Sequence, residues 1–340
     1  MLLREQVPLA PLTTFGIGGP ARWLAEADSE SSLVEAISFA RAQSLPLFVL
    51  GGGSNVLAAD EGFPGVVVRM VERGIQQEGN RFRVAAGEDW DAFVSHVVAL
   101  GFGGIECLAG IPGTVGGTPV QNVGAYGQEV SDTIVSVRVL DLKSLAFSEL
   151  PAAACAFSYR RSIFNSSHQG RFIVTRVEYR LRTAAFPVLS YPDLKRQFEG
   201  RPQPPSLAEA AAAVREIRHA KGMLLVPGED DCRSAGSFFK NPVIAESRYA
   251  AISALASSPA PRFAAGRGFI KIPAAWLLEE SGFHKGLVMG NAGISSRHTL
   301  ALINRGGATA KDILSLRDWI VGGVEKKFGI RLEPEPVWLG

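Results

Sequence analysis

Two glycine-rich segments are the parts of this 340-residue chain whose composition most directly suggests chemistry. The first reads Gly51-Gly52-Gly53-Ser54-Asn55 and follows the apolar run 47–50, which is typical of a buried strand. Glycine lets a backbone approach a ligand closely, and clustered N–H groups at the end of a strand bind phosphate. A tight structural turn uses the same residues, so this segment alone leaves a turn and a pyrophosphate site equally open.

The second segment, residues 111–127, reads Ile-Pro-Gly-Thr-Val-Gly-Gly-Thr-Pro-Val-Gln-Asn-Val-Gly-Ala-Tyr-Gly. It has no helix or strand character, and so long a loop is rarely left without a role inside a compact domain. A purely structural loop is the alternative. The segment predicts an extended ligand, with its backbone groups, Gln121 and Asn122 bonding a phosphate chain and the edge of a flat ring.

A third glycine cluster, residues 16–21, fits the G-x-G-x-x-A pattern of a Rossmann dinucleotide site, but its context does not. Residues 11–15 make a poor buried strand, and Pro20 disrupts the turn where a helix should begin. We therefore do not expect a Rossmann domain here.

The charges and cysteines exclude several classes of protein. With 35 Lys and Arg against 33 Asp and Glu, the chain lacks the strong basic field that collects nucleic acid or anionic lipid. Cys107, Cys155 and Cys232 are far apart and form no metal-binding pattern, so we expect free thiols and no metal. The N-terminus has no signal-peptide pattern and no apolar run is long enough to span a bilayer, so we expect a cytoplasmic protein without membrane or nucleic-acid partners.

Two α/β units must position the glycine segments. The first contains a helix over 29–43 and strands at 47–50 and 66–70. The second contains a strand at 82–86, a helix that stops at Gly101, strands at 134–142 and 172–181, and a helix over 207–218.

Near residue 220 the sequence changes from α/β units to loops and short elements. A short helix begins near Pro273, a strand is expected at 299–304, and a helix over 310–328 stops at Gly329. An extended tail covers residues 331–339. The sequence thus predicts an α+β protein built from α/β units, with domains over 1–70, 71–219 and 220–330.

Six segments in order resemble one family, the UDP-N-acetylenolpyruvoylglucosamine reductases, or MurB proteins. The resemblance spans nearly the whole chain. Its segments are residues 13–19, residues 50–57, the loop 111–127, Tyr159-Arg160-Arg161-Ser162-Ile163-Phe164, Gly236-Ser237-Phe238-Phe239-Lys240-Asn241-Pro242, and Leu332-Glu333-Pro334-Glu335.

The resemblance implies a fold and an activity. The fold is a two-part FAD-binding domain of the PCMH or vanillyl-alcohol-oxidase type, a C-terminal α+β substrate domain, and a tail, 331–340, that returns to the first part. The activity is the NADPH-dependent reduction of UDP-N-acetylglucosamine enolpyruvate to UDP-N-acetylmuramate in peptidoglycan synthesis, with FAD bound non-covalently. We expect the chain to be a monomer. The cofactor-binding residues implied are Gly51, Gly52, Gly53, Ser54, Asn55, Val56, Gly113, Thr114, Gly116, Gly117, Gln121, Asn122, Gly124 and Ala125.

The resemblance also assigns the reacting groups. Arg160 would hold the substrate carboxylate, Ser237 would donate a proton, and Glu335 would act with the arginine. The substrate-binding residues implied are Tyr159, Tyr191, Arg218, Lys221, Lys240 and Asn241. The segment 221–233 departs from the family pattern, so either Arg218 or Lys221 could hold the UDP phosphates.

The alternative is an FAD-dependent oxidase of the same flavin-binding superfamily. Such oxidases often tether flavin through His or Cys, and neither glycine segment contains a histidine.

Overall fold

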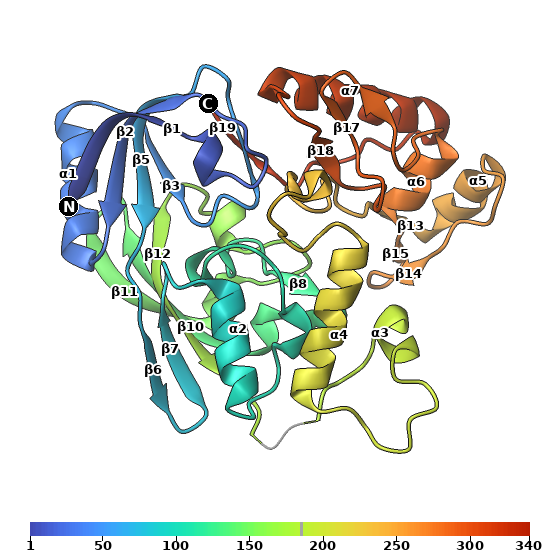
Figure 1. The fold of residues 1–340 in the computed structure, drawn as a ribbon, viewed down its shortest axis with the longest axis horizontal. Coiled ribbons are helices and arrows are strands. Elements are labelled where there is room, and N and C mark those ends of the chain that lie inside the picture. The colour runs from blue at the N-terminus through green and yellow to red at the C-terminus, as the bar shows by residue number, and fades with distance from the viewer. Residues whose placement is uncertain (184–185) are drawn as a thin grey trace. The chain divides into compact units, whose positions relative to one another are not determined.

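The structure is a computed structural model that describes residues 1–183 and 186–340. The chain divides into two compact units, each shown in Figure 1. The first unit comprises Met1–Val7, Ala21–Gly53 and Phe63–Ala220, and the second comprises Pro8–Pro20, Ser54–Gly62 and Lys221–Gly340. Both mix helices with strands, so the predicted α+β class is confirmed.

The first sheet of unit one has the strand order β1-β2-β5-β3. Its strands are β1 (Leu2–Pro8), β2 (Pro20–Ala27), β3 (Leu47–Leu50) and β5 (Phe63–Met70). Both β2 and β3 run parallel to β5, with Ala27 paired with Met70 and Leu50 with Arg69. The carboxyl ends of these three strands therefore meet at one edge, and the Gly51–Gly53 segment leaves the sheet there.

Helix α1 (Glu30–Ala42) covers this sheet and confirms the helix expected over 29–43. It begins at Ser29, whose hydroxyl accepts a hydrogen bond from the Ser32 amide. Its buried face, including Leu33 and Ile37, packs into a core with the strands.

The second sheet of unit one is antiparallel, with the strand order β11-β10-β12-β7-β6. Its strands are β6 (Ile75–Glu78), β7 (Arg81–Ala85), β10 (Ile134–Asp141), β11 (Ala146–Pro151) and β12 (Phe172–Arg180). Alternation along β12 sends Val177 and Tyr179 into a core with the helices α2 (Trp90–Ala99) and α4 (Leu207–Ala220). Ile173 joins the core of the first sheet instead, so β12 contributes to both.

The loop 111–127 is more structured than the sequence indicates. A 3₁₀ turn (Val115–Gly117) and a two-strand hairpin, β8 (Gly124–Ala125) with β9 (Gln128–Glu129), interrupt it. The expectation of seventeen residues without secondary structure is wrong in this respect, because Val115 is buried and the Gly116 amide bonds the Ala86 carbonyl.

Unit two has one core that joins α6 (Ala274–Glu280) and α7 (Ala310–Phe328) to short strands. Helix α7 ends at Gly329, whose φ of 62° is left-handed, as the sequence predicts. The strand expected at 299–304 is only β18 (Leu302–Asn304), because the Ala301 amide bonds the His298 carbonyl in a turn.

The remaining elements of unit two are short. They are α5 (Tyr249–Ala254), β13 (Val243–Ala245), β14 (Phe263–Ala264), β15 (Phe269–Lys271), β16 (Val288–Met289), β17 (Ala292–Ile294), β4 (Val56–Ala58) and β19 (Val337–Leu339); unit one also has α3 (Pro192–Arg196). The tail strand β19 pairs in parallel with β4. A 3₁₀ turn (Ala10–Leu12) precedes the third glycine cluster and β2 follows it, so the structure there is not a Rossmann turn.

Within the described ranges, no helix combines the length and the apolar character that a bilayer crossing requires. The three cysteines are buried free thiols.

Candidate functional site

The two glycine segments meet backbone to backbone in unit one. A Cβ added to Gly52 would lie 2.6 Å from the Cα of Gly113, and one added to Gly51 would lie 2.8 Å from the Thr114 hydroxyl. A side chain at either position would push the segments apart. Nothing lies within 4 Å of a Cβ added to Gly117, so the second segment is open on that side. This pair of backbones with one open side fits a pyrophosphate group.

Backbone hydrogen bonds fix the second segment on the antiparallel sheet. The Val115 amide donates to the Glu88 carbonyl, and the Gly116 amide donates to the Ala86 carbonyl, each at 2.9 Å. Gly116 must lack a side chain, because its Cβ would lie 2.6 Å from that of Ala86. The segment is therefore preorganised.

The side chain of Asn122 is buried and forms hydrogen bonds with other segments of unit one. Its amide nitrogen donates to Glu129 at 2.8 Å and to the Ser158 carbonyl at 3.2 Å, and its oxygen accepts from the Ser131 amide at 3.1 Å. Both N–H groups of the side chain are thus used inside the protein. Its side chain holds the second glycine segment against the turn that carries Arg160.

Tyr159 and Arg160 occupy the tip of a tight turn. Ser158 and Arg161 exchange two backbone hydrogen bonds of 3.0 Å that close it. Arg160 has φ 54°, a left-handed conformation that a non-glycine residue adopts at a cost of about 1 kcal/mol or more. The guanidinium lies 5.6 Å from the centre of the Tyr159 ring. Such a strained arginine, held by its surroundings, is typical of functional positions.

Arg218 is buried against the second glycine segment. Its Nε donates to the Gly110 carbonyl at 3.0 Å, and burial lowers the pKa of the guanidinium while the nearby Tyr126 opposes that change. Tyr126 in turn packs edge-on against Tyr191, with ring centres 5.3 Å apart. The predicted Tyr191 position therefore lies beside the predicted cofactor segment.

Ser237 lies in unit two between a left-handed glycine and two buried aromatic rings. Gly236 has φ 69°, and its amide donates to the Ser234 hydroxyl at 3.2 Å. The Phe238 amide donates to the Leu300 carbonyl at 2.8 Å, and its ring is buried. The serine is thus anchored on both sides.

Glu335 lies next to the Ser237 segment in unit two. Its amide donates to the Phe238 carbonyl at 2.8 Å, and Pro334 and Phe239 form an isolated bridge. The Asn55 side chain donates to the Glu335 carbonyl at 3.1 Å. Unit two therefore brings together the end of the first glycine segment, the tail glutamate and the serine.

Lys240 and Asn241 follow in the same segment. The Lys240 amine pairs with Glu333 at 3.3 Å, and the Asn241 oxygen accepts from the Ala274 amide at the start of α6. Val56, the next residue after the first glycine segment, pairs with Val337 of the tail.

Lys221 begins the segment 221–233. Arg297 forms ion pairs with two acidic residues of this segment. Arg297 contacts Glu229 at 2.5 Å and Asp231 at 3.4 Å. A Cβ on Gly222 would lie 3.0 Å from the Cβ of Asp231, so the two ends of the segment nearly touch. Sequence reasoning missed Arg297, because nothing in the chain's spacing relates it to Glu229.

Gln121, Gly124 and Ala125 complete the predicted cofactor residues, and all three are partly exposed in unit one. Of the three predicted catalytic residues, Arg160 belongs to unit one, and Ser237 and Glu335 belong to unit two.

Known proteins resemble this chain over almost its full length. The family model of the UDP-N-acetylenolpyruvoylglucosamine reductase C-terminal domain matches residues 227–339, and that of an FAD binding domain matches residues 21–144. A Streptomyces avermitilis protein named UDP-N-acetylenolpyruvoylglucosamine reductase is 45% identical, with 99% of this chain and 94% of the relative covered. A protein of the same name from Thermobifida fusca is 42% identical, with 99% and 98% covered.

A solved structure agrees with the sequence comparisons. The crystal structure of UDP-N-acetylenolpyruvylglucosamine reductase (MurB) from Thermus caldophilus matches with a TM-score of 0.69 and 29% identity over the full length of both chains. The chain therefore belongs to the UDP-N-acetylenolpyruvoylglucosamine reductase family, and it contains that family's FAD-binding and C-terminal domains.

Proposed function

We propose that this protein reduces UDP-N-acetylglucosamine enolpyruvate to UDP-N-acetylmuramate, with NADPH as the hydride donor and non-covalent FAD as the carrier. The observation that carries the proposal is the near-complete match to reductases of this name, with Arg160, Ser237 and Glu335 all present. The reaction supplies a peptidoglycan precursor in the cytoplasm, and through it cell shape and division. The chain acts as a monomer on small molecules.

The glycine segments are the proposed FAD site. The close approach of Gly52 to Gly113 and the open side at Gly117 support it, because a pyrophosphate needs backbone without intervening side chains. FAD supplies a carrier that accepts hydride from NADPH and delivers it to the substrate carbon. Residues 1–70 and 71–219 form the two parts of the FAD-binding domain in this proposal, and residues 220–330 form the substrate domain, with the tail returning to the first part.

Arg160 binds the carboxylate of the enolpyruvyl group. Its planar fork makes two parallel hydrogen bonds to a carboxylate, and negative charge grows there once hydride has reached the far carbon. The strained turn supports this role, since it fixes the direction of the side chain before the substrate arrives.

Ser237 donates the proton to the carbon that bears the carboxylate. A serine hydroxyl is a weak acid, so it serves only when it is held rigidly against its target. The anchoring of Gly236 and Phe238 supports that rigidity. Glu335, fixed beside the same segment, acts with Arg160 near the reacting carboxylate.

We assign the binding of the UDP phosphates to Lys221 and not to Arg218. The Arg218 guanidinium is buried and bonded to the Gly110 carbonyl, so it supports the cofactor segment instead. Tyr159, Tyr191, Lys240 and Asn241 remain the proposed contacts to the rest of the substrate.

An anaerobic titration tests the function. NADPH should bleach the flavin of the purified protein, and the enolpyruvyl sugar should restore its colour without oxygen. Failure of either step contradicts the reductase, and rapid recolouring by oxygen alone supports an oxidase.

A further inference from the structure

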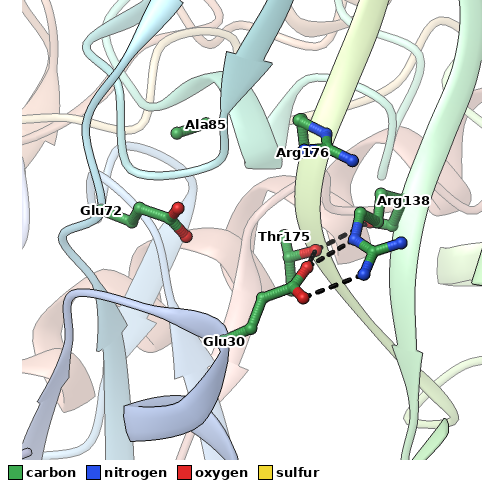
Figure 2. A pocket seen from close by; sticks show the side chains of 6 residues that line it. All are labelled: Glu30, Glu72, Ala85, Arg138, Thr175 and Arg176. Carbon is green, nitrogen blue, oxygen red and sulfur yellow. Dashed lines mark hydrogen bonds and ion pairs between the residues drawn. The ribbon is translucent and has the colours of Figure 1, made fainter. Parts of the chain in front are cut away.

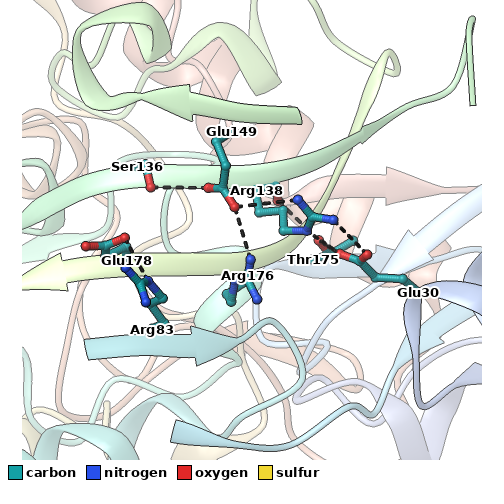
Figure 3. Close-up of polar contacts among 8 residues, drawn as sticks. All are labelled: Glu30, Arg83, Ser136, Arg138, Glu149, Thr175, Arg176 and Glu178. Atoms are coloured by element: carbon teal, nitrogen blue, oxygen red, sulfur yellow. Dashed lines mark hydrogen bonds and ion pairs between the residues drawn. The ribbon is translucent and has the colours of Figure 1, made fainter. Parts of the chain in front are cut away.

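Ion pairs in unit one join elements that are distant in the sequence. In Figure 2, Glu30 at the start of α1 contacts Arg138 of β10 at 2.5 and 2.9 Å. In Figure 3, Arg176 of β12 contacts Glu149 of β11 at 3.1 Å. Each pair thus links two elements of unit one through their side chains.

The pair of Asp91 and Arg215 differs, because its carboxylate also bonds the backbone. Asp91 lies in the first turn of α2 and Arg215 in the neighbouring helix α4 (Figure 1). The guanidinium contacts the carboxylate and, at 2.7 Å, the Ser95 hydroxyl. The other carboxylate oxygen accepts from the Gly110 amide at 2.5 Å. One carboxylate therefore joins two helices to the residue that immediately precedes the second glycine segment.

Both polar backbone groups of Gly110 are held by side chains. Its amide donates to Asp91, and its carbonyl accepts from the Arg218 Nε at 3.0 Å. Arg218 lies three residues after Arg215, so the two guanidinium groups extend from one side of α4. Gly110 has φ 72°, a left-handed conformation that strains a residue with a side chain. The backbone is therefore fixed at the point where the second glycine segment begins.

Trp90, the residue before Asp91, holds the same stretch at two further points. Its indole nitrogen donates to the Leu108 carbonyl at 3.1 Å, and its amide donates to the Gly113 carbonyl at 3.1 Å. Gly113 is the residue against which Gly52 packs. The first turn of α2 therefore sets the position of the backbone on which the approach of the two glycine segments depends.

The negative charge of Asp91 has a second effect, because two guanidinium groups lie near it. Burial lowers the pKa of the Arg218 guanidinium, while Tyr126 and Asp91 act against that change. Arg215 adds to the lowering of this pKa, because two guanidinium groups repel each other. The carboxylate offsets that repulsion. An asparagine at position 91 would keep an acceptor for the Gly110 amide but would lose this compensation.

We propose that Asp91 is a positioning residue for FAD binding: with Arg215 it fixes Gly110, and thereby the backbone of the second glycine segment, before the cofactor arrives. The inference rests on the proposed function, because it takes that segment as part of the FAD site. Asp91 itself does not touch the cofactor in this assignment. A backbone ordered in advance lowers the entropic cost of binding, so loss of Asp91 should appear as a loss of FAD affinity.

Titration of the flavin-free protein with FAD, followed by flavin fluorescence, tests this role. Asp91→Ala should lower the affinity for FAD about tenfold to a hundredfold, since a hydrogen bond to a charged group and an ion pair are both lost. Asp91→Asn should recover part of that affinity, because its amide oxygen still accepts from Gly110. With FAD in excess, reduction of the bound flavin by NADPH should stay near the parent rate in both variants.

Arg215 should act through Asp91. Arg215→Met should lower the affinity for FAD several-fold in the parent protein and should not lower it further in the Asp91→Ala background. Such non-additivity identifies two residues that act together. Additive losses would contradict the inference, because they would mean that Arg215 acts on FAD independently of Asp91.

Glu209→Gln is the matched control in the same helix. The Glu209 carboxylate accepts from the Ser206 amide at the start of α4 and pairs with Arg201, both at distances of 2.7–2.8 Å. It lies roughly 13 Å along the helix from Arg218. Loss of this cap should lower the melting temperature and leave the affinity for FAD unchanged.

Three outcomes would count against the inference. Unchanged or higher FAD affinity in Asp91→Ala overturns it alone. An equal loss of FAD affinity in Glu209→Gln also overturns it, because general destabilisation would then be the cause. If the parent protein itself fails to bind FAD, the proposed function is contradicted, and this inference with it.

Discussion

The backbone amide of Glu335 donates a 2.8 Å hydrogen bond to the carbonyl oxygen of Phe238. The two residues come from distant segments of unit two, and the contact holds the tail glutamate beside the residue that follows Ser237. Because the bond involves backbone atoms only, the side chains of Glu335 and Ser237 can be changed without breaking it. Substitutions at these positions therefore report on chemistry more than on folding.

Ser237→Ala should separate the two half-reactions. Flavin reduction by NADPH should stay near the parent rate, and oxidation by the enolpyruvyl sugar should slow by about a hundredfold or more, because the proton donor is lost. Stopped-flow absorbance of the flavin measures both steps. An equal loss in the two steps would contradict the role of proton donor.

Arg160→Lys keeps the charge but removes the planar fork, so turnover should fall by about a hundredfold. Arg161→Lys, the adjacent exposed arginine in the same turn, is the control and should stay near the parent. Arg160→Gly should abolish turnover and also raise the free energy of unfolding by about 1 kcal/mol, since glycine tolerates φ 54°. Thermal unfolding checks this gain, and a loss of stability in the glycine variant would refute the claim of strain.

Substitution of Arg218 should weaken FAD binding, whereas substitution of Lys221 should weaken binding of the UDP-sugar. Arg218→Met removes the bond to the Gly110 carbonyl, so FAD affinity should fall several-fold to about tenfold while the KM for the UDP-sugar changes little. Lys221→Met should do the reverse and raise that KM by about tenfold or more. Flavin fluorescence and steady-state kinetics on both variants test the pair. If Arg218→Met raises the KM and spares FAD, the two roles are exchanged.

Much of the fold could be predicted because local chemistry specifies it. The Ser29 cap and the left-handed Gly329 mark where α1 begins and α7 ends, and both are visible in the sequence. The buried amide of Asn122 could not be predicted, since its partners Glu129 and Ser158 are assigned only by the fold.

A polar cavity in unit one, lined in part by Glu30, Glu72 and Arg138, was equally hidden from sequence reasoning. Glu30, Glu72 and Arg138 lie in three separate segments, and only the order of the strands brings them to one edge. The catalytic assignments came from family motifs, because a lone serine or arginine carries no signal that distinguishes it from a surface residue.

Arg297 should act as a positioning residue for Lys221. Its contacts with Glu229 and Asp231 fasten the segment 221–233, so Arg297→Ala should raise the KM for the UDP-sugar several-fold and leave flavin reduction by NADPH unchanged. Arg297→Lys should recover part of the affinity. Loss of stability without a change in this KM would limit Arg297 to a structural role.

Glu72→Gln should stabilise the flavin-free protein in a pH-dependent way. Burial, together with the nearby Glu30, raises the pKa of Glu72 above its ordinary value of 4.5. For a carboxyl group whose folded pKa is raised, the unfolded chain ionises first, so the parent loses stability as the pH rises from 4.5 through the folded pKa. Glutamine has no such loss. The melting temperature of the variant should exceed that of the parent near neutral pH, and the difference should vanish well below pH 4.5. Scanning calorimetry on both apoproteins across this range measures it. A difference that stays constant with pH would mean that ionisation of Glu72 is not its cause.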